Sequence, residues 1–118
     1  MIKAAVVVLA GMETHEGLAR VVNAMETVKE LKVAEDDVKL IFDGAGTRWI
    51  RELTQSEHKA HGLFEAVRDR VDGVCAYCAG AFGVDEDART CQVPLLSGFE
   101  GHPSLRTLIA NGYSILTF

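Results

Sequence analysis

Continuous apolar runs alternate along the chain with segments in which apolar residues recur every three or four positions. The first run, 3–10 (KAAVVVLA), is rich in β-branched side chains and predicts a strand buried on both faces, as in a parallel sheet. Gly11 ends this run, and Thr14 can cap a helix that extends to about Val33. A second run, 38–42 (VKLIF), predicts another buried strand that stops at a turn-forming DGAG segment.

The remainder of the chain predicts three more strands. Residues 73–78 (GVCAYC) indicate a third strand, 93–96 a short fourth strand, and 113–118 (YSILTF) a closing strand. Helical patterns separate these runs, so strands and helices alternate from one end of the chain to the other. Such alternation is typical of right-handed crossovers between parallel strands.

Helices with recognisable starts are predicted between the later strands. A short one should contain Trp49, and the capping-box spacing of Thr54 and Glu57 predicts another that starts near Gln55. Pro103 suits the first turn of a last helix, whose leucine and isoleucine side chains we expect to be buried.

The predicted fold class is therefore α/β, a three-layer sandwich with a mainly parallel five-stranded sheet and helices on both faces, in one domain spanning residues 1–118. In open parallel sheets, ligands bind beyond the carboxyl ends of the strands. The loops beginning at Gly11, Asp43 and Cys78 should meet at that edge. We expect a pocket there, with these edge residues: Gly11, Thr14, His15, Asp43, Gly44, Gly46 and Gly80.

The composition is that of an ordinary globular protein, with 48% hydrophobic and 25% charged residues among 118. The net charge of −5 disfavours a nucleic-acid partner, because affinity for phosphates depends on an excess of Lys and Arg. The run 3–10 is too short for a bilayer, which takes about 20 residues, and lacks a signal-peptide layout. Three cysteines, an odd number, disfavour a disulfide-stapled scaffold. We expect a cytoplasmic protein without membrane or nucleic-acid partners.

Cys78 is the strongest catalytic candidate in the chain. It lies where a predicted buried strand meets the start of a helix, and backbone N–H groups at a helix start stabilise a reactive thiolate. Gly80 would leave room for a substrate to approach. The alternative interpretation is an unreactive strand cysteine, because free cysteines are among the most buried residues.

The other two cysteines are weaker catalytic candidates. Cys75 and Cys78 have the C-x-x-C spacing of redox proteins, but three strand steps would separate them by roughly 10 Å. That separation exceeds the limit of about 7 Å between Cα atoms for a disulfide. Cys75 is therefore interpreted as a core residue, and a thioredoxin-like motif is not expected. Cys91 could be a resolving thiol, but a structural or merely exposed role is the favoured interpretation.

Neither a metal nor a cofactor is expected. His58 and His61 have i, i+3 spacing on a predicted helix, yet no third ligand is evident, and a solvated helix surface is the favoured interpretation. His15 and His102 fall in loops near the predicted edge, where either could carry a proton. The segment 43–47 (DGAGT) lacks a complete phosphate-loop motif, which disfavours nucleotide or flavin binding by analogy with flavodoxin-like sheets.

Four features resemble the DsrE-like proteins: the apolar first strand, VKLIFDGAG at 38–46, CAGAFGV at 78–84, and the closing pattern from Leu105 through Asn111-Gly112-Tyr113 to Phe118. The resemblance covers nearly the whole chain. It implies a compact α/β fold with a largely parallel five-stranded sheet, assembled into trimers or hexamers. It also implies that the cysteine at the end of a central strand, here Cys78, can carry a persulfide and pass the sulfur to a partner protein.

Two main functions therefore remain open. In the first, the protein is sulfurtransferase-like, and Cys78 receives sulfur from a donor and hands it to an acceptor protein. In the second, it is a non-catalytic oligomeric module that binds a ligand or partner at the strand ends without sulfur chemistry. The reactivity of Cys78 toward alkylating reagents discriminates between them.

Overall fold

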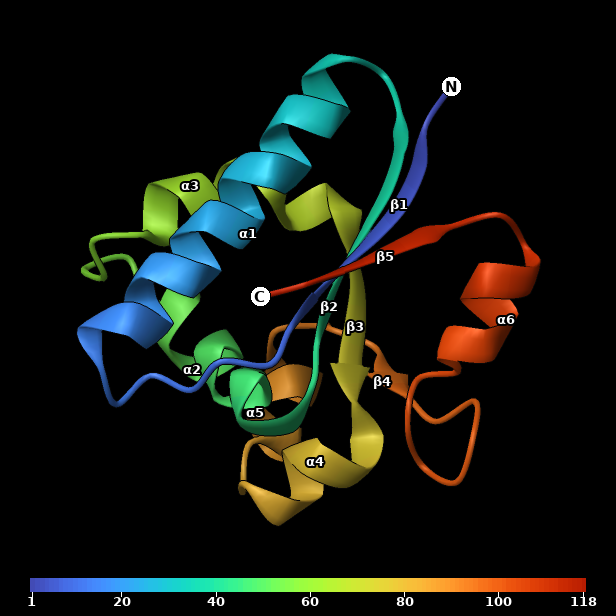
Figure 1. Ribbon diagram of the computed structural model, residues 1–118. Helices are drawn as coiled ribbons and strands as arrows, with labels where there is room; N and C mark the ends of the chain where they lie inside the picture. Colours follow the sequence, from blue (N-terminus) through green and yellow to red (C-terminus); the bar gives the residue numbers. More distant parts are fainter.

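Five parallel strands form the central sheet of the computed structural model, which describes residues 1–118 (Figure 1). Their bounds are β1 (Lys3–Val8), β2 (Asp37–Phe42), β3 (Val71–Cys75), β4 (Leu95–Leu96) and β5 (Ser114–Thr117). The order across the sheet is β4-β3-β2-β1-β5, and every neighbouring pair is parallel. The predicted α/β class and five-stranded parallel sheet are confirmed.

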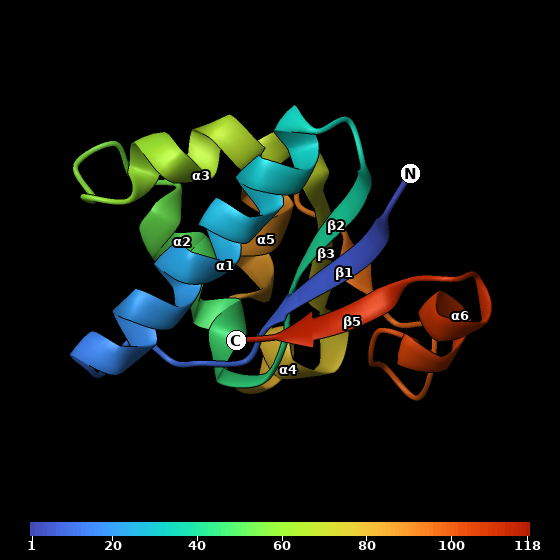
Figure 2. The same cartoon turned by 45° about the horizontal axis from the view of Figure 1, so that its top comes forward.

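Helices cover both faces of this sheet. In chain order they are α1 (His15–Val33), the 3-10 turn η1 (Gly44–Arg48), α2 (Trp49–Leu53), α3 (His61–Val67), the 3-10 turn η2 (Arg68–Arg70), α4 (Ala76–Ala81), α5 (Asp85–Thr90) and α6 (Leu105–Ala110). Helices α1 and α3 lie side by side over one face, and α6 lies on the other side of the sheet (Figure 2). This arrangement agrees with the predicted helices on both faces.

No helix of the structure combines the length and the apolar character that crossing a membrane would require.

The main core lies between the sheet and the helices α1, α2 and α3. Val6, Phe42, Met25 and Phe64 are among its fully buried side chains. Burying a side chain of this kind contributes roughly 1.5–3 kcal/mol. Strand β1 is buried from residue 4 to residue 8 because it lies between β2 and β5 in a sheet whose two faces are covered by helices. Its continuous apolar sequence is therefore the signature of a central strand.

The third strand ends earlier than its apolar sequence predicts. The predicted strand ran to Cys78, but β3 ends at Cys75 and α4 begins at Ala76. The Cys75 sulfur accepts a hydrogen bond from the backbone N–H of Cys78 at 3.4 Å, in the manner of a helix N-cap. A short apolar run does not distinguish a buried strand from a buried helix, and alanine-rich residues after Cys75 favour helix.

Two predicted helices also differ from the structure. No helix starts near Gln55, because the Thr54 hydroxyl donates to the Ile50 carbonyl at 2.7 Å instead of capping a new helix. The last helix is present, but Leu105 is 36% exposed and Ile109 60% exposed, so their predicted burial is wrong. The sheet face under α6 is less completely covered than the face under α1.

Candidate functional site

Four chemically active side chains meet beyond the carboxyl ends of β2 and β3. Asp43 follows β2, Cys75 ends β3, Cys78 lies in the first turn of α4, and His102 comes from the loop before α6. One potential ligand atom from each lies within 4.8 Å of every other. We call these four residues the thiol cluster. It forms because β2 and β3 are neighbours in the sheet, so their ends share one edge.

Cys75 is the buried member of the thiol cluster. Its side chain is fully inaccessible, and its sulfur lies 3.2 Å from His102 Nδ1. The thiol also donates toward the carbonyl of Gly101 at 3.7 Å. Burial raises the pKa of the Cys75 thiol to about 12; the backbone N–H of Cys78 opposes this increase, and hydrogen bonds to the Cys78 and Asp43 side chains add to it. Cys75 is therefore a neutral thiol near neutral pH.

Cys78 is the half-buried thiol of the pair. The C-x-x-C spacing covers one turn at the start of α4 and not three strand steps, because β3 has already ended. One helical turn rises only about 5 Å. The predicted separation of roughly 10 Å is therefore wrong, and the two sulfur atoms are neighbours within the thiol cluster.

His102 is held against the cysteines by a tight turn. Its backbone N–H and C=O pair with Phe99 at 2.8 and 2.9 Å, and the carbonyl of Gly101 accepts from the N–H of Tyr77 at 2.9 Å. Gly101 has a φ of 83°, which favours glycine, and a Cβ there would lie 3.3 Å from Cβ of Tyr77. The His102 and Tyr77 rings also pack at a centroid distance of 5.1 Å.

Asp43 is oriented by the turn that follows β2. One carboxylate oxygen accepts from the N–H of Gly44 at 2.8 Å, and Asp43 N donates to the carbonyl of Val8 at 2.9 Å. Gly44 has a φ of 55°, and a Cβ on Gly46 would lie only 2.2 Å from the Val8 oxygen. Both glycines shape the turn, and they hold the Asp43 carboxylate toward the cysteines.

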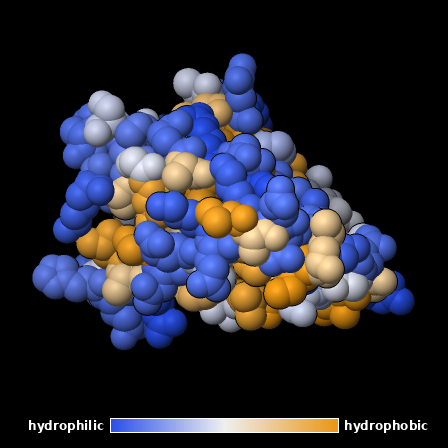
Figure 3. All heavy atoms as spheres, turned by 90° about the horizontal axis from the view of Figure 1, so that it is seen from above, coloured by the Kyte–Doolittle hydropathy of each residue, from blue (hydrophilic) through white to orange (hydrophobic).

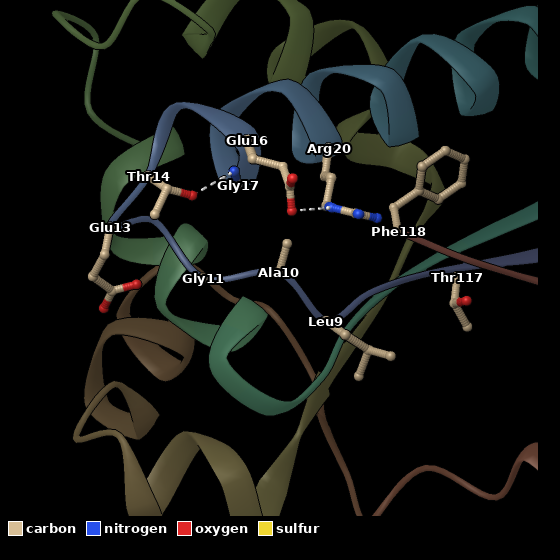
Figure 4. Close-up of a pocket in the computed structure, with 10 residues that line it drawn as sticks. All are labelled: Leu9, Ala10, Gly11, Glu13, Thr14, Glu16, Gly17, Arg20, Thr117 and Phe118. Atoms are coloured by element: carbon tan, nitrogen blue, oxygen red, sulfur yellow. Dashed lines mark hydrogen bonds and ion pairs between the residues drawn. The ribbon is translucent and has the colours of Figure 1, made fainter.

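Two of the predicted pocket residues lie at a separate site. Gly11 and Thr14 line an open pocket of about 490 Å³ at the ends of β1 and β5, together with Glu16, Arg20 and Phe118 (Figure 4). Glu16 and Arg20 form an exposed ion pair at 3.2 Å, and no cysteine contributes to the lining. The predicted edge residues therefore do not form one continuous pocket.

Other predicted site residues lie apart from the thiol cluster. His15 lines a cavity of about 320 Å³ that His58 also lines. Gly80 lies on the exposed side of α4, where a Cβ would meet nothing within 4 Å. His58 and His61 are tied into the fold, since Nδ1 of His58 accepts from the N–H of Ala60 and Nδ1 of His61 pairs with the carbonyl of Leu53.

The sequence indicates only part of the thiol cluster. Cys78 and Asp43 are identified from strand ends, but Cys75 is interpreted as core, and His102 is one of two loop histidines near the edge. The C-x-x-C spacing is the signal that could have joined Cys75 to the site. No local signal joins His102, which is 27 residues from Cys75 and reaches it through the left-handed turn at Gly101.

The raised pKa of Cys75 predicts a loss of stability at alkaline pH. An unfolded thiol ionises near its ordinary value of 9.0, whereas folded Cys75 keeps its proton until about pH 12. The stability present below pH 9.0 should therefore decline as pH rises toward 12, because only the unfolded state releases the proton. Urea unfolding across this range should show a steeper decline for the wild type than for Cys75→Ser. Parallel pH profiles for the two proteins would contradict the prediction.

Comparisons with known proteins agree with this fold. A model described as the DsrE/DsrF-like family matches residues 3–118. The uncharacterized protein MJ0733 of Methanocaldococcus jannaschii is 34% identical over 87 residues, which are 74% of this chain and 70% of the relative. A solved structure, the conserved protein of unknown function BT1422 from Bacteroides thetaiotaomicron, has a TM-score of 0.65 at 13% identity, over 97% of this chain and 94% of that chain. This structural likeness shows the fold alone. The match across residues 3–118 and the M. jannaschii relative place the chain in the DsrE/DsrF-like family.

Proposed function

We propose that this protein carries sulfur as a persulfide on Cys78 and passes it to a partner protein. The family is associated with sulfur relay. The observation that carries the proposal for this chain is a half-buried Cys78 thiol at the carboxyl edge of the sheet, beside a thiol that is fully buried. Solvent access and helix-start placement together make Cys78 the sulfur acceptor.

The proposed reaction transfers one sulfur atom without net oxidation. The Cys78 thiolate attacks the outer sulfur of a donor persulfide, the donor S–S bond breaks, and the donor thiolate leaves. An acceptor thiolate then attacks the outer sulfur on Cys78, and the Cys78 thiolate leaves. Each step is a thiol exchange whose rate depends on the thiolate fraction and on access.

Cys75 favours retention of the sulfur because it is a poor nucleophile. A Cys75 thiolate could attack the inner sulfur of a Cys78 persulfide, forming a Cys75–Cys78 disulfide and expelling hydrosulfide. With a pKa raised to about 12, the buried thiol is almost entirely protonated near neutral pH. The persulfide should therefore persist until an acceptor arrives.

The surface near Cys78 suits a protein partner. Tyr77 is 63% exposed, Phe82 43% and Phe99 62%, and all three lie on or beside α4 and the His102 turn. Aromatic side chains are enriched at protein interfaces. We propose that this aromatic surface receives the sulfur donor or acceptor, in the cytoplasm, where thiols remain reduced.

We also propose that copies of this chain associate, as the sequence resemblance implies. Apolar groups interrupt an otherwise hydrophilic surface in Figure 3. Ile109 of α6 and Leu116 of β5 are exposed. Association would remove such side chains from water at roughly 25 cal/mol per Å² of apolar surface. Sedimentation velocity at several protein concentrations measures the assembly directly.

A binding module without sulfur chemistry is the second candidate. The pocket at the ends of β1 and β5, which no cysteine lines, is the observation that favours it. A ligand there would contact Glu16 and Arg20 rather than a thiol. An unreactive Cys78 together with a ligand that protects this pocket would support the binding module.

Sulfur loading tests the proposed function. The reduced, metal-free protein would be incubated with a small-molecule persulfide donor, and peptides would be analysed by mass spectrometry after alkylation. We expect one added sulfur atom on Cys78, removable by a reductant, and none on Cys75, with the two residues distinguished by fragmentation of the peptide that contains both. The control is Cys91, a half-buried thiol outside the cluster. Absence of the adduct on Cys78 while a free thiol control accepts sulfur would exclude this function.

A further inference from the structure

We propose that the thiol cluster is a Zn²⁺ site formed by Asp43, Cys75, Cys78 and His102. The proposal goes beyond sulfur transfer and stands on a different observation, the convergence of four ligand atoms. These atoms lie within 4.8 Å of one another although they come from three separate stretches of chain. Neither His58 nor His61 takes part.

The spacing of the four atoms is close to that of a tetrahedral zinc centre. Zn–S bonds of about 2.3 Å and Zn–N or Zn–O bonds of about 2.0–2.2 Å place neighbouring ligand atoms about 3.3–3.8 Å apart. Cys75 Sγ and His102 Nδ1 are already 3.2 Å apart. No separation in the cluster exceeds 4.8 Å, so none must shorten by more than about 1–1.5 Å to reach the tetrahedral value. Rotation of the half-buried Cys78 or Asp43 side chain supplies a movement of that size.

The donor set selects the metal. Two cysteine sulfurs, which release their protons on binding the metal, and one imidazole favour Zn²⁺, whereas Mg²⁺ and Ca²⁺ prefer sites made entirely of oxygen ligands. The Asp43 carboxylate completes a four-coordinate set. It forms no ion pair with Lys or Arg in this structure, so no protein cation competes with a metal for it.

Hydrogen bonds from neighbouring backbone groups orient the proposed ligands. One oxygen of Asp43 accepts from the N–H of Gly44, which orients the carboxylate beside the cysteines. His102 is anchored by its backbone pair with Phe99, and the N–H of Cys78 points to the Cys75 sulfur. Hydrogen bonds of this kind orient ligands and strengthen metal binding. Cys78, Asp43 and His102 are half-buried, so an ion can enter from their side.

Zinc titration of the full-length chain tests the site. The reduced, metal-free protein would compete with a chromogenic chelator for Zn²⁺, and we expect one ion per chain. Each of Cys75→Ser, Cys78→Ser, His102→Ala and Asp43→Asn should weaken binding about tenfold or more, since even residues that only orient ligands contribute about 10–100-fold. The matched controls Cys91→Ser and His15→Ala should bind as the wild type does. Binding of less than one ion, or equal affinity in every variant, would overturn the proposal.

Spectroscopy of the wild type keeps the test independent of variant folding. Co²⁺ in place of Zn²⁺ should give the strong visible absorption of a tetrahedral centre and a thiolate-to-metal charge-transfer band. Bound Zn²⁺ should also protect Cys78, but not Cys91, from alkylation. A weak octahedral spectrum or an unprotected Cys78 would contradict the site. These readouts use no persulfide, and sulfur loading uses metal-free protein, so the two proposals can fail separately.

Discussion

A Cys78→Ser variant is expected to acquire no sulfane sulfur from a persulfide donor, while Cys75→Ser and Cys91→Ser load as the wild type does. The serine hydroxyl does not ionise near neutral pH and cannot attack the donor sulfur. Cys75 cannot replace Cys78 because it is fully buried and its pKa is raised to about 12. Loading should therefore depend on one thiol of three.

Loaded sulfur would be measured by cold cyanolysis and located by peptide mass spectrometry. Circular dichroism and thermal unfolding would confirm that Cys78→Ser remains folded, which is expected for a half-buried side chain of nearly the same size. Equal loading of Cys78→Ser and the wild type would reject Cys78 as the carrier. Loading that follows Cys91 instead would move the site away from the thiol cluster.

Cys75→Ser separates the two roles that the thiol cluster could have. If Cys75 stays protonated at neutral pH and therefore does not attack the Cys78 persulfide, the variant should retain this persulfide as long as the wild type does. At alkaline pH the wild type should lose sulfur faster, since ionised Cys75 displaces hydrosulfide and forms the Cys75–Cys78 disulfide. The same variant should bind Zn²⁺ weakly. Sulfur retention and metal affinity therefore respond differently to one substitution.

The sequence predicts where the site lies in the fold better than it predicts which residues form the site. The apolar run of β1 and the turn after β2 locate the carboxyl edge of a parallel sheet, which correctly places Asp43 and Cys78 there. The boundary between β3 and α4 could not be predicted, because an apolar run of six residues suits either element. That error extended the strand from Cys75 through Cys78 and made the predicted distance between the two cysteines too long. The sequence places His102 in a loop near this edge, but its contact with Cys75 could not be predicted, because it depends on a turn 27 residues further along the chain.

Gly17→Ala is expected to lower the free energy of unfolding by about 2 kcal/mol, although alanine favours helices. Gly17 lies in the first turn of α1, and a Cβ there would be 1.9 Å from the carbonyl oxygen of Gly11. Backbone cannot rotate aside as a flexible side chain can, so the start of α1 or the loop at Gly11 must move. Overpacking of this kind costs about 1–3 kcal/mol, occasionally more, and the gain of about 1 kcal/mol in helix propensity offsets only part of it.

Gly62→Ala is the matched control, because Gly62 also lies in a helix and a Cβ there would meet nothing within 4 Å. It should stabilise the protein by about 0.5–1 kcal/mol. Urea unfolding midpoints should therefore move in opposite directions for the two variants. A Gly17→Ala protein as stable as Gly62→Ala would show that α1 does not rest on the Gly11 backbone. Gly11 and Gly17 both line the open pocket at the ends of β1 and β5. A lower stability of Gly17→Ala would therefore mean that the close packing of α1 against the Gly11 backbone maintains the shape of this pocket.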